Sequence, residues 1–255
     1  MVGPSRNWIP RQHGVWAMML APGIAGGFLA GFRWQHAVLI VAWVSAYLAF
    51  MAIRGWLRPR HRRQFVVPAL TYAGISLVSV IGLLVWRLAL LWWAVPLAVL
   101  LGASLVLIST GRERTVINDA LLIGSSCLMT VVGATCQGLH GMDPSSFLRI
   151  VGIPHAWLAA AVLAVYFWGT IFYVKTMIRE RGKAGWYATS VVYHLVLVVA
   201  AFLLNGWIGA VSVIVAVRAI LVPRLWPRAK PAFIGVGEIG ISTVLTVALC
   251  LTVTL

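Results

Sequence analysis

A short basic stretch, Tyr173–Trp186, joins two long apolar segments and contains four cations and one carboxylate. If it continues as a helix from the apolar run before it, Lys175, Arg179 and Lys183 fall at i, i+4 and i+8 and form one stripe of like charge. Each neighbouring pair then costs roughly a few tenths of a kcal/mol, so the stripe must lie in water or face an anion. The stretch predicts either a site for phosphate or carboxylate oxygens, which Arg and Lys bind well, or a solvated loop beside a membrane span.

Two further motifs contain residues that suit an anion site. Segment 10–18 contains His13 and Trp16, one helical turn apart, and segment 111–119 contains Arg112, Arg114, Asn118 and Asp119. The triplet Arg-Glu-Arg occurs at 112–114 and again at 179–181, which hints at an internal duplication. Simpler roles are also open. Asn118 or Asp119 stands where a helix N-cap belongs, and Trp16 suits the aromatic belt of a membrane interface.

Three ionisable residues interrupt the apolar segments near the C-terminus: His194, Arg218 and Glu238. Each lies a turn or two inside its segment, and alternating helices place all three at a similar depth on one side. Ionisable groups in such segments are costly, usually face the interior of a bundle and are candidates for a functional site. We expect Glu238 to pair with Arg218 or His194; the alternative for Arg218 is to snorkel to the interface.

Together these residues predict one cavity, facing the cytoplasm, that binds an anionic, phosphate-bearing lipid or a small anion. The candidates for proton transfer in a reaction there are Glu180, Asp119 and His194. The expected binding residues are His13, Trp16, Arg112, Arg114, Asn118, Lys175, Arg179, Arg181, Arg218 and Glu238. Glu113, Asp119 and Glu180 could also hold a magnesium ion against a phosphate, although no two of them have a strong metal-ligand spacing.

The composition places these residues in a membrane protein. Of the residues, 62% are hydrophobic and only 10% are charged, which leaves too little polar surface to cover a soluble globule. Several nearly uncharged runs reach about eighteen residues or more, long enough to cross a hydrocarbon core of ~30 Å as helices. The net charge of +15 then indicates anionic lipid headgroups rather than nucleic acid as partners. Cys127, Cys136 and Cys250 lie in apolar segments and are expected to be core residues.

We predict an all-α bundle of about nine transmembrane helices. The expected spans are residues 13–32, 36–53, 65–86, 89–109, 120–137, 157–174, 187–204, 207–222 and 233–255. Residues 1–12 then form a cytoplasmic segment, and residues 13–255 form a single transmembrane domain. Nearly all cations fall in loops on one side, which places the N-terminus in the cytoplasm and the C-terminus outside. The basic run 54–63 on that side is expected to bind acidic headgroups.

The motifs resemble those of the YwiC-like family of bacterial membrane proteins, and the resemblance extends over nearly the whole chain. It is most specific at Gln12–Met18, at Arg112–Arg114 followed by Asn118-Asp119, and at Val174-Lys175 followed by Ile178–Arg181. It implies a multi-pass protein of the bacterial inner membrane, and it implies topology more than activity.

A weaker similarity is to the UbiA-type intramembrane prenyltransferases, which have a similar number of helices and bind a polyprenyl diphosphate through magnesium in a cytoplasm-facing cavity. The segment Phe167–Arg181 takes the place of their second aspartate-rich motif. The paired aspartates are absent here: the loop after the second span has only Arg54–Arg63, and this segment has only Glu180. The similarity implies a lipid-linked transferase with a degenerate site. An anion or lipid transporter or flippase and a non-catalytic assembly protein remain open as alternatives.

Overall fold

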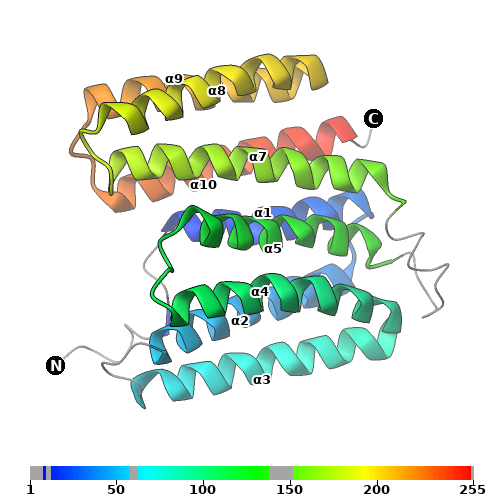
Figure 1. The fold of residues 1–255 in the computed structure, drawn as a ribbon. Helices are drawn as coiled ribbons and strands as arrows, with labels where there is room; N and C mark the ends of the chain where they lie inside the picture. The colour runs from blue at the N-terminus through cyan, green and yellow to red at the C-terminus, as the bar shows by residue number, and fades with distance from the viewer. Residues whose placement is uncertain (1–7, 10–12, 58–62, 138–151, 254–255) are drawn as a thin grey trace. The chain divides into compact units, whose positions relative to one another are not determined.

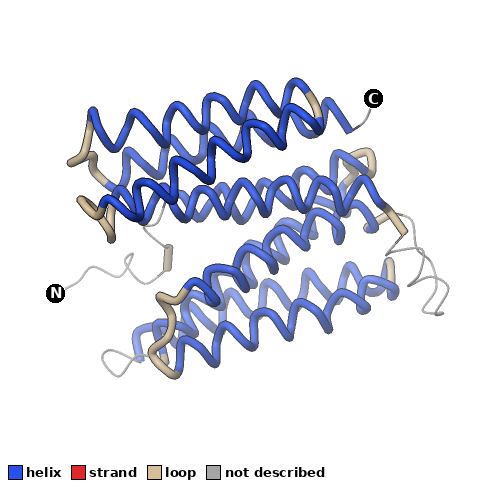
Figure 2. The backbone as a smooth tube through the Cα atoms, turned by 45° about the horizontal axis from the view of Figure 1, so that its top comes forward, coloured by secondary structure: helices blue, strands red, loops and turns tan. Residues whose placement is uncertain are grey.

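The computed structural model describes residues 8–9, 13–57, 63–137 and 152–253 of the 255-residue chain. Within these residues the chain forms helices and no strand (Figure 1; Figure 2). The α-helices there are α1 (His13–Leu29), α2 (Trp34–Trp56), α3 (Arg63–Trp86), α4 (Ala94–Ser109), α5 (Val116–Thr135), α7 (Pro154–Met177), α8 (Ala184–Leu204), α9 (Gly206–Leu225) and α10 (Pro231–Val253). A 3-10 helix, η2 (Leu88–Trp93), leads into α4. The predicted all-α architecture is confirmed.

Most of these helices can cross a membrane. In the described part of the chain, 8 helical segments are long and apolar enough to do so, with η2 and α4 forming one segment, Leu88–Ser109. Helix α1 is apolar but has only 17 residues. Its length of about 25 Å falls somewhat short of a ~30 Å hydrocarbon core. The predicted spans therefore correspond to helices, and α1 is shorter than its expected span.

Two very short connections separate consecutive helices at the predicted places. Arg87 precedes η2 directly after α3. Asn205 ends α8, and its side-chain oxygen accepts hydrogen bonds from the backbone N–H groups of Trp207 (2.8 Å) and Ile208 (3.4 Å). Asn205 is thus the N-cap of α9 and satisfies donors that the first turn of a helix leaves unpaired.

The helices divide into two compact units, which we call the N-terminal unit (residues 1–11 and 22–160) and the C-terminal unit (residues 12–21 and 161–255). In the N-terminal unit, α2 packs on α3 and α4 packs on α5. In the C-terminal unit, α9 packs on both α8 and α10. The expectation of a single transmembrane domain stays a prediction.

The N-terminal unit contains a very close helix crossing between α1 and α5. A Cβ atom at Gly26 would lie 2.2 Å from the carbonyl O of Thr130, and one at Gly133 would lie 3.0 Å from the carbonyl C of Gly26. His36 ties α2 to the same place: its Nδ1 accepts from the N–H of Arg33 (3.0 Å) and its Nε2 donates to the carbonyl O of Gly133 (3.2 Å). Small residues at such crossings let helix backbones touch inside a membrane.

The C-terminal unit brings two loops together. The α7–α8 loop and the α9–α10 loop lie at one end of the four helices (Figure 1), where Arg181 Nη2 donates to the carbonyl O of Ala229 (3.5 Å). Beneath the loops is a buried apolar cluster of Tyr173, Met177, Ala219 and Ile234. We call this end the basic end, because the loops and the helix turns beside them contain Lys175, Arg179, Arg181, Lys183, Arg224, Arg228 and Lys230.

Candidate functional site

A buried ion pair joins α9 to α10 near the basic end. Arg218 Nη1 donates to Oε1 of Glu238, and only 10% of the Arg218 side chain and 2% of the Glu238 side chain are exposed. Each residue lies two helical turns, about 10 Å, from the basic end of its helix. The predicted pairing of Glu238 with Arg218 is confirmed, and Arg218 does not snorkel because this buried partner holds it inside.

Hydroxyl groups complete the surroundings of Glu238. Its Oε2 accepts hydrogen bonds from the hydroxyls of Thr170 (3.0 Å) and Tyr166 (3.4 Å), both on α7. The Tyr166 hydroxyl also lies 3.0 Å from Oγ of Ser242, one turn after Glu238 on α10. A buried carboxylate needs such partners for its lone pairs. Sequence reasoning missed these three hydroxyls; the available signal was the spacing of four residues between 166 and 170 and between 238 and 242.

The guanidinium of Arg218 has further hydrogen-bond donors. Its Cζ lies 4.1 Å from the ring centroid of Tyr173, a cation–π contact that holds the group in place. Its Nε and Nη2 are buried, and no described residue accepts a hydrogen bond from them. Because buried charged donors cost free energy when they are unpaired, this group can bind a further acceptor, such as a phosphate or carboxylate oxygen.

His194 lies on α8 and is 1% exposed. Its Nδ1 is 2.6 Å from the carbonyl O of Ser190, so Nδ1 is the donor there and Nε2 of the neutral ring is an acceptor. Nε2 has no hydrogen-bond partner within the described residues. A Cβ atom at Gly169 of α7 would lie 3.0 Å from Nε2, so glycine makes room for the ring. His194 therefore makes no hydrogen bond to Arg218 or Glu238 and is not the partner of Glu238.

Helix α1 reaches the ion pair through Gly14. A Cβ atom at this position would lie 3.8 Å from Cβ of Glu238 and 3.9 Å from Cα of Gly235. The motif that opens α1 thus lies close to α10 at Gly235 and at the aliphatic part of the Glu238 side chain. Of the two residues predicted from this motif, Trp16 is half-buried, and the side chain of His13 lies outside the part that the structure describes.

The predicted stripe of Lys175, Arg179 and Lys183 is wrong. Helix α7 ends at Met177, and the chain turns before α8 begins, so the three residues do not share a helix face. The turn passes through Gly182, whose φ of 82° is a conformation that glycine adopts readily. The sequence suggested a longer helix because Lys175 and Arg179 have suitable spacing, but this spacing does not specify where the helix ends.

The cations after α7 have separate environments. Lys183 Nζ pairs with Glu180 Oε2 (2.7 Å), which neutralises the carboxylate predicted to act in catalysis. Arg181 Nε donates to the carbonyl O of Met177 (2.9 Å) and so caps the end of α7. Arg179 is exposed, whereas Lys175 is 8% exposed.

Helix α5 begins differently from the prediction. Its N-cap is Thr115, whose hydroxyl accepts from the N–H of Asn118 (3.3 Å), so the suggestion that Asn118 or Asp119 is the N-cap is wrong. The buried side chain of Asn118 instead donates to the carbonyl O of Glu113 (2.9 Å) and accepts from Ser104 of α4 (2.6 Å). Asn118 therefore fastens α4, the loop and α5 to one another. Asp119 is half-buried on the first turn of α5.

The carboxylates considered for magnesium do not fit a metal site. Glu113 Oε2 pairs with Arg54 Nη2 (3.2 Å), and its Oε1 lies 3.9 Å from Nε of the largely exposed Arg114. Glu180 pairs with Lys183 in the other unit. Across the described ranges, no group of three or more His, Cys, Asp or Glu side chains could hold a metal ion.

The predicted site residues fall into both units. The N-terminal unit contains Arg112, which is exposed, with Arg114, Asn118 and Asp119. The C-terminal unit contains Lys175, Arg179, Glu180, Arg181, His194, Arg218 and Glu238. A cavity shared by the two sets stays a prediction, and their assigned roles in binding and proton transfer stay predictions too.

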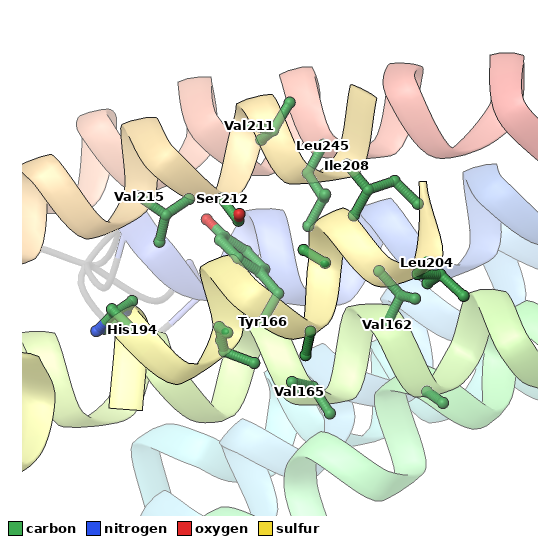
Figure 3. Close-up of a pocket in the computed structure, with 14 residues that line it drawn as sticks. Val162, Val165, Tyr166, His194, Leu204, Ile208, Val211, Ser212, Val215 and Leu245 are labelled. Atoms are coloured by element: carbon green, nitrogen blue, oxygen red, sulfur yellow. The ribbon is translucent and has the colours of Figure 1, made fainter. Parts of the chain in front are cut away.

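A pocket of about 220 Å³ lies among helices α7 to α10, and we call it the α7–α10 pocket. It is lined by Ala161, Val162, Val165, Tyr166, His194, Leu197, Ala200, Ala201, Leu204, Ile208, Val211, Ser212, Val215 and Leu245. Figure 3 shows His194 at one end of the pocket and Leu204 towards the other. Tyr166 belongs to both sites, because its ring lines the pocket and its hydroxyl contacts Glu238.

Apolar spanning helices and a buried charge network between them define a multi-pass helical membrane protein. Residues 9–134 match the family model described as YwiC-like protein. The uncharacterized protein YwiC of Bacillus subtilis is 28% identical over 250 residues, which cover 96% of this chain and 98% of the relative. An uncharacterized protein of Haemophilus influenzae is 24% identical over 243 residues, or 94% of this chain and 96% of the relative. The chain is thus similar to YwiC-like proteins over nearly its whole length. No solved structure matches it.

Proposed function

We propose that the protein binds a phosphate-bearing anionic lipid at the basic end of its C-terminal unit. The observation that carries the proposal is the buried Arg218, which Glu238 and Tyr173 hold in place while Nε and Nη2 have no hydrogen-bond partner among the described residues. Guanidinium groups bind phosphate oxygens through paired N–H donors. A lipid phosphate at this depth would satisfy donors that otherwise cost free energy.

The charge near Arg218 favours an anion over a cation. The seven cations of the basic end accompany a single carboxylate, Glu180, in the stretches 175–183 and 224–230. Aromatic rings position two of the cations: Lys175 Nζ lies 5.4 Å from the ring centroid of Trp186, and Arg224 Cζ lies 5.2 Å from that of Tyr187. Aromatic residues of this kind favour the headgroup level of a bilayer, where lipid phosphates lie.

The basic end is expected to face the cytoplasm of a bacterial inner membrane. Cation-rich loops remain on the cytoplasmic side during insertion, so we expect the N-terminus inside and the C-terminus outside. Reporters that work on only one side of the membrane, fused separately to the two ends, measure this. An external N-terminus, or both ends on the same side, would contradict the orientation.

Replacing Lys175 and Arg179 together with glutamine is expected to weaken binding of phosphatidylglycerol at least about tenfold, or about 1.4 kcal/mol. Both cations belong to the basic end, and Lys175 is 8% exposed, so its interaction with a phosphate is less screened than one in open solvent. Native mass spectrometry of the full chain, titrated with the lipid, measures the change in affinity.

The matched control replaces Arg33 and Arg63, two exposed cations of the N-terminal unit, with glutamine. It removes the same net charge and should alter binding much less. Equal losses in the two double variants would mean that the basic end is only a solvated, positively charged flank of the membrane. Melting temperatures of both variants check that the folded protein is retained.

A transferase activity and a lipid-transport activity would each add a different step to lipid binding. A transferase of degenerate UbiA type would need Glu180, Asp119 or His194 to carry a proton on the bound lipid, and a flippase would need only the binding site. An accessory protein would bind lipid without turnover or translocation. The likeness to UbiA-type enzymes stays a prediction, and lipid binding is the step that the transferase and the flippase share.

A further inference from the structure

We infer that the α7–α10 pocket binds one hydrocarbon chain of the lipid whose phosphate the basic end recognises. The inference rests on the proposed function and names the part of the lipid that the cations cannot recognise. Headgroup and chain would then be held by adjoining parts of one unit.

The lining of the pocket suits hydrocarbon. Apart from Tyr166, His194 and Ser212, every lining residue is alanine, valine, leucine or isoleucine. From His194 to Leu204 the lining follows α8 for ten residues, about 15 Å, which gives the pocket the elongated form of a chain rather than of a compact ligand. A hydrocarbon chain bound in the pocket buries its apolar surface against these residues. It also fills space that would otherwise lack packing contacts.

The pocket has an entrance towards the outside of the helices. Ala161 of α7 and Ala200 of α8 line it and are exposed, whereas Tyr166, Val215 and Leu245 are buried at its inner side. Helices α7 to α10 are long and apolar enough to span a membrane, so we expect lipid chains around the exposed alanines of these helices. A chain can therefore enter sideways from the bilayer, past side chains too small to block it.

The polar end of the pocket faces the ion pair. His194 lies at the end of the pocket nearer the start of α8, which is the basic end (Figure 3). Tyr166 connects the two sites directly, since its ring lines the pocket and its hydroxyl donates to the carboxylate that holds Arg218. An amphipathic ligand with a phosphate beside Arg218 and a chain along α8 matches this polarity. A purely apolar ligand would leave Arg218 and His194 without partners.

Filling the pocket tests the inference. Ala201→Trp places a large ring on the lining, and Ala188→Trp places the same ring on α8 outside the lining, at an exposed position. Dioleoyl phosphatidylglycerol and dihexanoyl phosphatidylglycerol, which share a headgroup, are titrated onto the purified full chain and counted by native mass spectrometry. We expect Ala201→Trp to weaken dioleoyl binding at least about tenfold, about 1.4 kcal/mol, and to leave dihexanoyl binding within about twofold of the unsubstituted protein.

Three outcomes separate the two proposals. Loss of dioleoyl binding in Ala201→Trp but not in Ala188→Trp supports a chain in the pocket. Unchanged dioleoyl binding in Ala201→Trp overturns the pocket as the chain site, while the headgroup site still stands if Lys175 and Arg179 matter. Absence of binding by both lipids to the unsubstituted protein overturns the proposed function and this inference together. If Ala201→Trp does not fold, Ala201→Phe against Ala188→Phe makes the same comparison with a smaller ring.

Discussion

Glutamine in place of Glu238 is expected to lower the free energy of unfolding by about 3–5 kcal/mol, because it leaves Arg218 as a buried charge without its counter-charge. The carboxylate is 2% exposed and accepts hydrogen bonds from Arg218, Thr170 and Tyr166, so water cannot replace what is lost. The measurement is reversible unfolding of the purified protein in mixed micelles, followed by circular dichroism.

Glu180→Gln is the matched control for this prediction. Glu180 also has a cationic partner, but the pair with Lys183 lies at the surface, where such pairs contribute about 0–1 kcal/mol. The double variant Arg218→Met with Glu238→Gln removes both charges and should recover much of the stability. It should nevertheless lose phosphatidylglycerol binding, which separates the role of the pair in the fold from the proposed role of Arg218. A Glu238→Gln protein as stable as the Glu180→Gln protein would refute the argument.

Alanine at Gly26 is expected to destabilise the protein by about 1–3 kcal/mol or more, the usual cost of overpacking. Its Cβ would lie 2.2 Å from the carbonyl O of Thr130 and 2.9 Å from the carbonyl C, and these backbone atoms cannot rotate away. Helix α1 must therefore move away from α5, which opens the crossing with Gly133 as well. Leucine at the same position should prevent this crossing from forming.

At Gly82 of α3 and Gly102 of α4 we do not expect alanine to destabilise the protein, because a Cβ atom at either position would meet nothing within 4 Å. Alanine there should be neutral or stabilising by up to about 1 kcal/mol, through its higher helix propensity. Thermal unfolding of the three alanine variants in one detergent compares them directly. If the Gly26→Ala protein has the same melting temperature as the Gly82→Ala and Gly102→Ala proteins, the close α1–α5 contact does not exist in the protein.

The helices themselves could be read from the sequence. The predicted spans 65–86 and 89–109 correspond to α3 and to η2 with α4, and the break at Asn205 was also found. The reason is that a hydrocarbon core imposes a minimum length on every span and requires each backbone group to be paired within it. Length and polarity alone therefore reveal where helices lie, without knowledge of their neighbours.

The pairing of Arg218 with Glu238 could be predicted from the sequence for a related reason. A lone ionised side chain inside an apolar segment is so costly that it needs a partner at its own depth. Counting turns from the helix ends gave the depth of each residue, and the structure confirms the pair. His194 could not be resolved in this way, because its Nδ1 is satisfied by the carbonyl O of Ser190 on its own helix.

The rest of the site was decided by tertiary structure. The only sequence signal for Thr170, Tyr166 and Ser242 is the four-residue spacing of 166 and 170 and of 238 and 242. This spacing does not decide the partner, since a hydroxyl in an apolar segment can also bond to a carbonyl of its own helix. Whether it instead reaches Glu238 depends on how α7 and α10 are rotated about their axes. Hydropathy records the length of a helix but not this rotation. For the same reason the close approach at Gly26 and the α7–α10 pocket emerged only when neighbouring helices were packed together.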